Sequence, residues 1–180
     1  MKIRSNSLWA AGALVLVTLA VLLVSGSGSG ASTEQPRRAY DFTFEDINPA
    51  SATHGKQLAL SEFYIDRGLV LQFVASWCKP CRDELPELQE LHAEGDTPIL
   101  LVAADEYGYT EGILIVAERS GITAPLLFVP KERTTEMEQY YDHEILPSTY
   151  LIDRQGAIVE VHEGVWSKER LLAAVEKALD

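Results

Sequence analysis

Six residues near the middle of the chain, Leu69–Val74, form a nearly continuous apolar run that is interrupted only by Gln72. A short apolar run of this length is typical of a strand that is buried on both faces. Farther along, Leu85, Leu88 and Leu91 recur at three-residue steps, which predicts a helix with one apolar face. The pattern therefore predicts a buried strand, a short loop and a helix, in that order.

The residues before this strand show a different period. Tyr40, Phe42 and Phe44 alternate with polar residues, and Leu58 and Leu60 alternate again after a stretch that is rich in turn residues. Alternation with a period of two is typical of strands that are buried on one face only. The pattern predicts two short strands at the start of the folded region.

The rest of the chain alternates between apolar runs and helical stripes, which predicts an α/β fold. Further strands are expected at residues 98–104, 126–129, 149–153 and 157–162, and further helices at residues 60–63, 112–120, 135–141 and 167–179. Thr135 and Glu138 have the spacing of a capping box, and Ser167 is placed to cap the last helix.

The loop between the buried strand and its helix contains the only two cysteines of the chain, in the sequence Trp77-Cys78-Lys79-Pro80-Cys81. A thiolate is the nucleophile in disulfide exchange, and an unperturbed thiol has a pKa of about 8.5. The free N–H groups at a helix N-terminus favour the anion, and so does a neighbouring Lys79 cation. We therefore assign Cys78 as the attacking thiolate. Pro80 suits an early helical position, and Cys81, on the same side of the helix, is assigned as the buried resolving thiol.

The segment Leu69–Pro86 resembles the active-site segment of the thioredoxin superfamily, and its Glu84-Leu85-Pro86 is similar to the membrane-anchored, extracytoplasmic TlpA/ResA-like branch. Residues 145–153, which read Ile-Leu-Pro-Ser-Thr-Tyr-Leu-Ile-Asp, resemble the cis-proline loop of that family and the strand after it. The resemblance covers residues 39–180. It implies a thioredoxin fold, in which a central mixed β-sheet is flanked by helices, with an N-terminal β-hairpin extension.

The resemblance also implies a surface for an extended client peptide. It predicts a cis bond between Leu146 and Pro147 and places both residues against the Cys78 sulfur, where the backbone of Leu146 could pair with the client. Trp77 is expected to cover the sulfur and to form part of this surface, although its position would also suit a core aromatic residue. Lys79 and Pro80 complete the predicted active-site segment, and Lys79 would tune the reduction potential.

Proton transfer at the second cysteine is expected to involve Glu84. Many thioredoxins have a buried aspartate where this chain has Gln72, and an amide does not accept a proton at neutral pH. TlpA/ResA-like proteins carry a glutamate at the position of Glu84, three residues after Cys81. If Glu84 is partly buried, its pKa is raised and it could exchange a proton with the resolving thiol. The alternative is an ordinary surface glutamate.

The first 24 residues read as a targeting segment. Lys2 and Arg4 form a basic start, and Leu8–Val24 carries no charge. Signal peptides have apolar regions of about 7–15 residues and spanning helices need about 20, so this run lies at the boundary. We expect an uncleaved signal-anchor, a single transmembrane helix that holds the rest of the chain outside the cytoplasm. Cleavage within Ser25–Ser27 would instead release a secreted protein.

A flexible linker is expected at residues 25–38, because their first part is made of serine and glycine, and this leaves residues 39–180 as one thioredoxin-like domain. The chain has 15 Lys and Arg against 27 Asp and Glu, a net charge of −12. Such a charge argues against a nucleic-acid surface and against attraction to anionic lipids.

Other uses of two cysteines fit the sequence less well. A structural zinc site needs four ligands, and the four histidines are scattered, so we expect neither a metal nor a cofactor. Haem attachment would need a histidine directly after Cys81, where Arg82 stands. A bond that spans two intervening residues constrains the unfolded chain little, so it would be a poor structural disulfide.

These observations predict a monomeric thiol-disulfide oxidoreductase in the periplasm or on the outer face of the cytoplasmic membrane. It would take electrons from a membrane thiol donor and reduce disulfides in exported client proteins. The resemblance to the TlpA/ResA-like branch implies that this client could be apocytochrome c in cytochrome c maturation, another exported protein or a metallochaperone. An oxidant or isomerase with the same chemistry is one alternative. A non-enzymatic peptide-binding module with an inert disulfide is another. A peroxidase is disfavoured, because the lone upstream cysteine of peroxiredoxins is absent.

Overall fold

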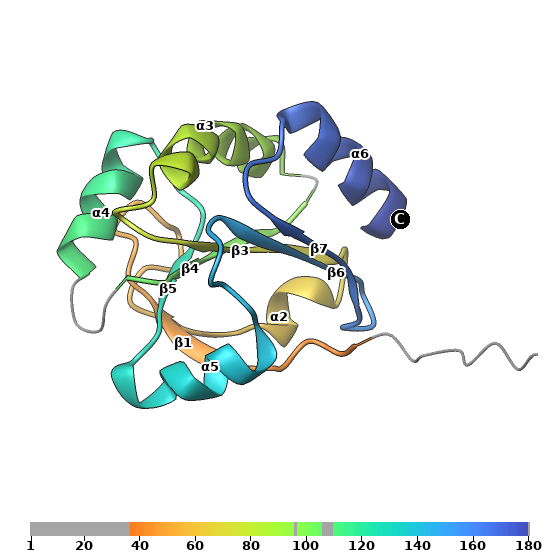
Figure 1. Ribbon diagram of the computed structural model, residues 1–180, viewed down its shortest axis with the longest axis horizontal. Coiled ribbons are helices and arrows are strands. Elements are labelled where there is room, and N and C mark those ends of the chain that lie inside the picture. The colour runs from red at the N-terminus through yellow and green to blue at the C-terminus, as the bar shows by residue number, and fades with distance from the viewer. Residues whose placement is uncertain (1–36, 96, 106–109, 180) are drawn as a thin grey trace, which may run out of the picture. The chain divides into compact units, whose positions relative to one another are not determined.

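The predicted buried strand lies inside a single mixed sheet (Figure 1). The computed structural model describes residues 37–95, 97–105 and 110–179, and within them seven strands run in the order β2-β1-β5-β4-β3-β6-β7. The strands are β1 (Thr43–Asp46), β2 (Gln57–Ala59), β3 (Leu69–Val74), β4 (Ile99–Ala103), β5 (Leu126–Phe128), β6 (Ser148–Ile152) and β7 (Ile158–Glu163). The helices are α2 (Ser61–Tyr64), α3 (Lys79–Glu94), α4 (Thr110–Arg119), the 3-10 turn η1 (Lys131–Arg133), α5 (Thr134–Tyr140) and α6 (Lys168–Leu179).

The order of the strands confirms the thioredoxin fold and its N-terminal extension. Strands β3, β4 and β5 are parallel, whereas β6 pairs antiparallel to β3 and β7 pairs antiparallel to β6. The first two strands form an antiparallel hairpin, and β1 joins it to the sheet beside β5. The hairpin therefore extends the sheet on the side of β5, and β3 keeps its place between β4 and β6.

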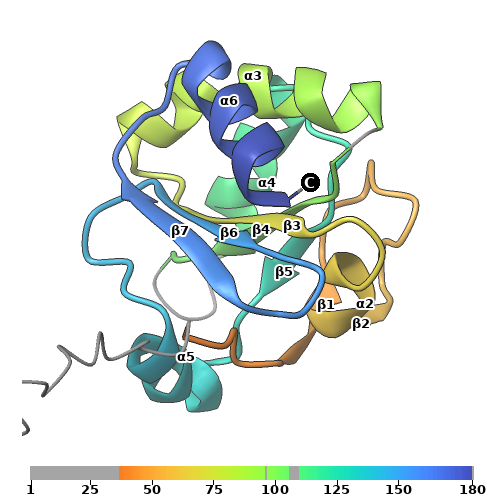
Figure 2. The ribbon, with the colours of Figure 1, turned by 90° about the vertical axis from the view of Figure 1, so that its right-hand side faces the viewer.

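Helices cover both faces of the sheet (Figures 1 and 2). One apolar cluster packs the sheet against α3, α4 and α6, and it contains both cysteines. A second cluster lies on the opposite face, where Met137 of α5 packs with Phe42 and Phe73. Because successive side chains of a strand point to opposite faces, β3 serves both clusters: Val70 and Val74 face α3, while Leu71 and Phe73 face α5.

One predicted helix start was wrong. The structure shows no capping box at Thr135 and Glu138; α5 begins at Thr134, directly after the 3-10 turn, and Arg133 precedes it without a side-chain cap hydrogen bond. The backbone is already helical at Arg133, with φ −103° and ψ 0°. A capping box needs an extended residue at that point, which this continuous turn does not supply.

The predicted anchor at residues 1–24 lies outside the described residues, as does most of the predicted linker. Its last two residues, Arg37 and Arg38, belong to the folded unit: the Ile158 N–H donates to the Arg37 carbonyl at 2.8 Å, and Arg38 forms a bridge with Ala157. Within the described part of the chain, no helix has both the length and the apolar character that crossing a membrane requires.

A buried carboxylate fastens the hairpin extension to the sheet. Asp46 is fully buried, and one of its oxygens accepts from the backbone N–H groups of Asn48 and Leu126, both at 3.0 Å. Its other oxygen accepts from the Thr53 hydroxyl at 2.7 Å. The carboxylate therefore joins the loop after β1 to the first residue of β5.

We predict that Asp46→Ala lowers the free energy of unfolding by about 3 kcal/mol, because it leaves buried donors without a partner. Urea unfolding of the oxidised protein measures this change. Asp41→Ala is the matched control, because the exposed Asp41 carboxylate accepts one hydrogen bond, from the Ser61 N–H, and its loss should cost less than about 1 kcal/mol. Equal losses in the two variants would contradict this account of the extension.

Candidate active site

The cysteine pair lies where β3 gives way to α3. Cys78 is the N-cap of α3 in an extended conformation, and Cys81 lies in the first turn. The two form a disulfide with their Cα atoms 5.3 Å apart, and the Cys78 Sγ also accepts a hydrogen bond from the Cys81 N–H at 3.1 Å. A sulfur at the N-cap is favoured as an anion, because the first N–H groups of the helix point at it. This geometry agrees with the assignment of Cys78 as the attacking sulfur.

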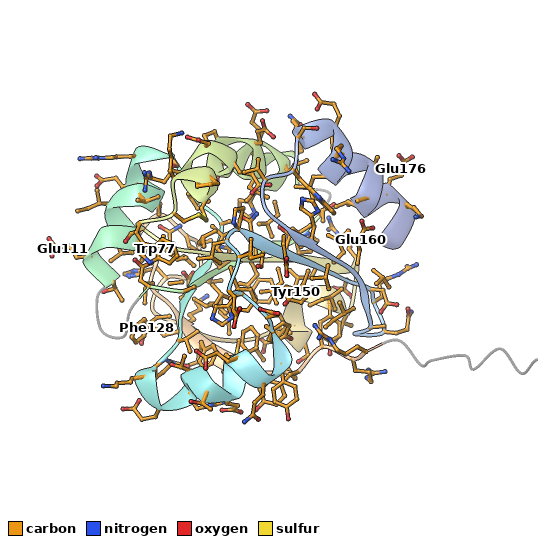
Figure 3. The ribbon with its side chains drawn as sticks, in the orientation of Figure 1. Trp77, Glu111, Phe128, Tyr150, Glu160 and Glu176 are labelled. Atoms are coloured by element: carbon orange, nitrogen blue, oxygen red, sulfur yellow. A yellow bond between two sulfur atoms is a disulfide. The ribbon has the colours of Figure 1, made fainter. Side chains whose placement is uncertain are left out.

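The disulfide itself is covered, and the residue before it is not. Cys78 is 3% exposed and Cys81 is 1% exposed, whereas Trp77 is 65% exposed. Figure 3 shows Trp77 beside the start of α3. An exposed aromatic ring of this size is common at binding surfaces, and the exposure rules out the alternative that Trp77 is a core aromatic residue.

The loop that carries Trp77 is held by two charged residues that the sequence did not single out. The Ser76 N–H donates to both carboxylate oxygens of Asp105 at 3.0 Å, and the Ser76 hydroxyl donates to Asp105 as well. The Ser76 carbonyl accepts from Arg82 at 2.6 Å. Asp105 follows β4 closely, and the C-terminal ends of neighbouring parallel strands lie at the same edge of a sheet. This property of parallel strands is the signal by which Asp105 could have been identified from the sequence.

The sequence predicted that the Lys79 charge would act on Cys78, but the structure pairs this charge with a carboxylate. The Lys79 ammonium group forms an ion pair with Asp83 on the next turn of α3, and both side chains are exposed. An exposed pair of this kind adds little stability. The pairing does, however, direct the Lys79 charge to a carboxylate, so the helix N-terminus is the main feature that favours a thiolate at Cys78.

The Leu146–Pro147 peptide bond is cis, as the family resemblance implied. The loop is fixed because the Pro147 carbonyl accepts from the Gly164 N–H at 2.8 Å. Leu146 packs against the apolar cluster that contains both cysteines. Ile145, the residue before it, is 55% exposed. The structure therefore brings the cis-proline loop to the same core as the disulfide.

Glu84 lies inside the core on the same helix as Cys81. It is 2% exposed; its Oε2 accepts from the Gln72 amide Nε2 at 2.8 Å, and its Oε1 accepts from the Trp166 backbone N–H at 3.0 Å. Burial raises the pKa of Glu84, the two hydrogen bonds oppose this rise, and the charge of Glu87 adds to it. The alternative of an ordinary surface glutamate is therefore excluded.

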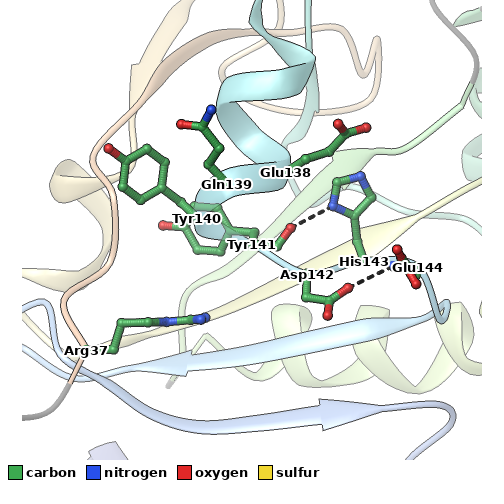
Figure 4. Close-up of a pocket in the computed structure, with 8 residues that line it drawn as sticks. All are labelled: Arg37, Glu138, Gln139, Tyr140, Tyr141, Asp142, His143 and Glu144. Atoms are coloured by element: carbon green, nitrogen blue, oxygen red, sulfur yellow. Dashed lines mark hydrogen bonds between the residues drawn. The ribbon is translucent and has the colours of Figure 1, made fainter.

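A concave site lies away from the cysteines. A cavity of about 680 Å³ is lined by α5 and the loop after it (Figure 4). In it the His143 ring stacks on Phe73 at 4.9 Å between centroids, and the His143 Nδ1 is 2.9 Å from the Tyr141 carbonyl. None of the predicted site residues lines this cavity. Within the described residues, no group of three or more His, Cys, Asp or Glu side chains could hold a metal ion.

Comparisons with known proteins agree with this geometry. A family model described as the AhpC/TSA family matches residues 37–161. The thiol-disulfide oxidoreductase ResA of Geobacillus kaustophilus is 30% identical over 132 residues, which is 73% of this chain and 70% of that protein. The same-named protein of Oceanobacillus iheyensis is 31% identical over 136 residues, which is 74% of this chain and 67% of that one.

A solved structure shows the same architecture. The exposed lipoprotein thioredoxin Etrx1 of Streptococcus pneumoniae is 25% identical to this chain, with a TM-score of 0.60. The match covers 77% of this chain and 99% of that one. The fold and the Cys-x-x-Cys chemistry therefore rest on independent comparisons of sequence and of structure.

The raised pKa of Glu84 predicts how stability depends on pH. Because the folded pKa lies above the unfolded value of 4.5, the contribution of Glu84 is fully present below that value and is lost as the pH rises through the folded pKa. Glutamine cannot ionise. We therefore predict that Glu84→Gln gains stability relative to the natural protein as the pH rises from about 4 to about 8, measured by urea unfolding.

Glu118→Gln serves as the control, because it removes one negative charge at an exposed position of α4. The difference in unfolding free energy between Glu84→Gln and the natural protein should grow with pH by more than it does for the control. A difference that stays constant, or that shrinks as the pH rises, would contradict the burial of an ionisable carboxyl group at Glu84.

Proposed function

We propose, from the premise that this chain belongs to the AhpC/TSA family and is a thiol-disulfide oxidoreductase of the ResA type, that it reduces disulfides in exported client proteins. The observation that carries the proposal is the placement of the Cys78–Cys81 pair, with one sulfur at the helix N-cap and the other on the same helix as the buried Glu84. In this proposal the two sulfurs therefore have different roles.

The reaction begins with the reduced pair. The Cys78 thiolate attacks one sulfur of the client disulfide, and the other client sulfur leaves as a thiolate and takes up a proton. Cys81 then loses its proton and attacks the Cys78 sulfur, which breaks the mixed disulfide and releases the second client thiol. Two electrons have passed to the client, and the protein is left with the Cys78–Cys81 disulfide that the structure shows. A membrane thiol donor would restore the reduced pair.

In this scheme Glu84 is the proton acceptor for Cys81. A helix places residues three apart on the same side, and Glu84 follows Cys81 by three residues. A carboxyl group whose pKa is raised by burial accepts a proton more readily than an exposed one, so it can serve as the acceptor for the Cys81 proton. Gln72 cannot serve in this way, so Glu84 replaces the buried aspartate of other thioredoxins.

In this proposal the client surface consists of Trp77 and the cis-proline loop. Trp77 is exposed next to Cys78, and Leu146 and Pro147 lie in the cis-proline loop. An extended client could form backbone hydrogen bonds with Leu146 while its side chains contact the Trp77 ring. Lys79 and Pro80 are the first two residues of α3, and we propose that Lys79 adjusts the reduction potential.

Reduction rather than oxidation is favoured by the charges around the pair. A strong oxidant stabilises its reduced, thiolate form. Here the charge of Lys79 is paired with Asp83, and the group on the helix beside Cys81 is the acidic Glu84. A neighbouring acid disfavours negative charge on the Cys81 sulfur, and this opposes the stabilisation of the Cys78 thiolate by the helix N-terminus, which supports a lower reduction potential.

The proposed location is outside the cytoplasm, on the outer face of the cytoplasmic membrane or in the periplasm. The uncharged run after Lys2 and Arg4 supports a membrane anchor, and the Streptococcus pneumoniae relative is named as an exposed lipoprotein. Disulfides persist in such a compartment, so a reductant there has clients. Apocytochrome c before haem attachment is the client class that we propose, with the protein acting as a monomer and without a cofactor.

A trapping experiment tests this function. Reduced Cys81→Ser protein, mixed with a disulfide-bonded peptide that contains the Cys-x-x-Cys-His haem-attachment sequence, should accumulate a mixed disulfide through Cys78. The reason is that the second attack is blocked. A non-reducing gel and mass spectrometry measure the adduct. The natural protein should release the reduced peptide, and the control Cys78→Ser should form no adduct.

Two outcomes would contradict the proposal. If the oxidised protein converts the dithiol peptide to its disulfide faster than the reduced protein does the reverse, the protein is an oxidant. If neither form exchanges with the peptide although the peptide binds, the site is a peptide-binding module with an inert disulfide.

A further inference from the structure

The α3 side of the core contains a row of polar groups. Gln72 of β3 and Thr149 of β6 are register partners, so their side chains lie on the same face of the sheet. Both are buried, at 1% and 2% exposure, and Glu84 of α3 meets them there. The neighbours of Gln72 on this face of β3, Val70 and Val74, belong to the apolar cluster. A polar group in such surroundings is costly unless its hydrogen bonds are made.

The amide nitrogen of Gln72 makes all the hydrogen bonds that it can. It has two hydrogens, and it donates to the Glu84 Oε2 at 2.8 Å and to the Thr149 Oγ1 at 3.1 Å. The amide oxygen Oε1 is buried and has no hydrogen-bond partner among the described residues. A buried acceptor without a partner is uncommon in native proteins and calls for an explanation.

Protonation of Glu84 would change the partner that its Oε2 requires from a hydrogen-bond donor to a hydrogen-bond acceptor. A hydroxyl on the Glu84 Oε2 would have to donate, and it would then face the Gln72 amide hydrogen that points at this oxygen. Rotation of the amide by half a turn replaces Nε2 with Oε1, whose two lone pairs can accept from the Glu84 hydroxyl and from the Thr149 hydroxyl together. One side chain in one place can therefore offer a donor to the ionised form of Glu84 and an acceptor to its protonated form.

We propose that Gln72 is a positioning residue that rotates its amide when Glu84 exchanges a proton and so holds the Glu84 carboxyl group in place in both states. This role rests on the proposed function, in which Glu84 exchanges a proton with Cys81. It also gives a reason for a neutral residue at this position. An amide supports both forms of Glu84, whereas a second carboxyl group would compete with Glu84 for the proton.

Several titratable groups lie on the elements around Glu84. Glu87, on α3, is the carboxylate that opposes ionisation of Glu84. His162 of β7 stacks on the ring of Trp166, whose backbone N–H binds Glu84, with 4.5 Å between ring centroids. Lys168 of α6 pairs with Glu90 and Glu94. Cys81 does not titrate while it is in the disulfide, so the oxidised protein isolates the effect of Gln72.

The test follows the Glu84 carboxyl carbon by 13C NMR against pH, in the oxidised full-length chain labelled at glutamate, with Glu84→Gln to assign the signal. Gln72→Met removes both amide atoms and keeps the length of the side chain. Because a hydrogen bond to a charged acceptor is worth more than one to a neutral group, the titration midpoint should rise by about one pH unit, a tenfold change in proton affinity.

Gln89→Met is the matched control. Gln89 lies on α3, the helix of Glu84, and its amide is paired with Thr123 at 2.9 Å and 2.7 Å, but it is only partly buried. This variant should leave the Glu84 midpoint within about 0.3 units of the natural value. A midpoint in Gln72→Met that is no higher than in this control would overturn the proposal.

A second readout needs no variant of Gln72. In the natural protein, the side-chain NH2 signals of Gln72 should shift at the same midpoint as Glu84, because the hydrogens lose both acceptors when the amide rotates. Signals that stay fixed through the Glu84 titration would contradict the rotation. A failure of the proposed function would be seen in a different experiment. In that case Glu84→Gln would leave the pH profile of client reduction unchanged, regardless of the NMR titration of the oxidised protein.

Discussion

The buried carboxyl group of Glu84 joins three parts of the molecule that are distant in the sequence. One oxygen binds the side chain of Gln72 in the central strand, and the other binds the backbone of Trp166 just before the last helix. A carboxyl group is costly to bury without such partners. Because Cys81 lies one turn earlier on the same helix, the contacts that hold Glu84 also hold the second sulfur of the redox pair.

The two sulfurs consequently occupy unlike environments three residues apart. Cys78 receives an N–H from the helix that it caps, which favours negative charge, and it adjoins the exposed ring of Trp77. Cys81 lies deeper, on the helix that carries a buried acid, which favours a bound proton. This difference suits the proposed sequence of attack by Cys78 and later resolution by Cys81.

The sequence predicted the elements of the fold and the cysteine pair well, because both depend on local patterns. The run Leu69–Val74 and the alternation before it were read correctly, and the family resemblance supplied the cis bond at Pro147. Contacts between distant residues were not predicted. Asp105 binds the loop before Cys78 through a pairing of β3 with β4, and Gln72 meets Glu84 only once α3 packs on the sheet. The capping box failed because the 3-10 turn before α5 had no sequence signal.

The reduction potential of the Cys78–Cys81 pair in the full-length chain, equilibrated in dithiothreitol or glutathione buffers, tests the central claim most directly. If the acid beside Cys81 and the paired charge of Lys79 stabilise the disulfide, the potential should lie near or below thioredoxin's value of about −270 mV. A potential near about −120 mV, where the reduced form is the stabilised one, would contradict the proposed direction and identify the protein as an oxidant.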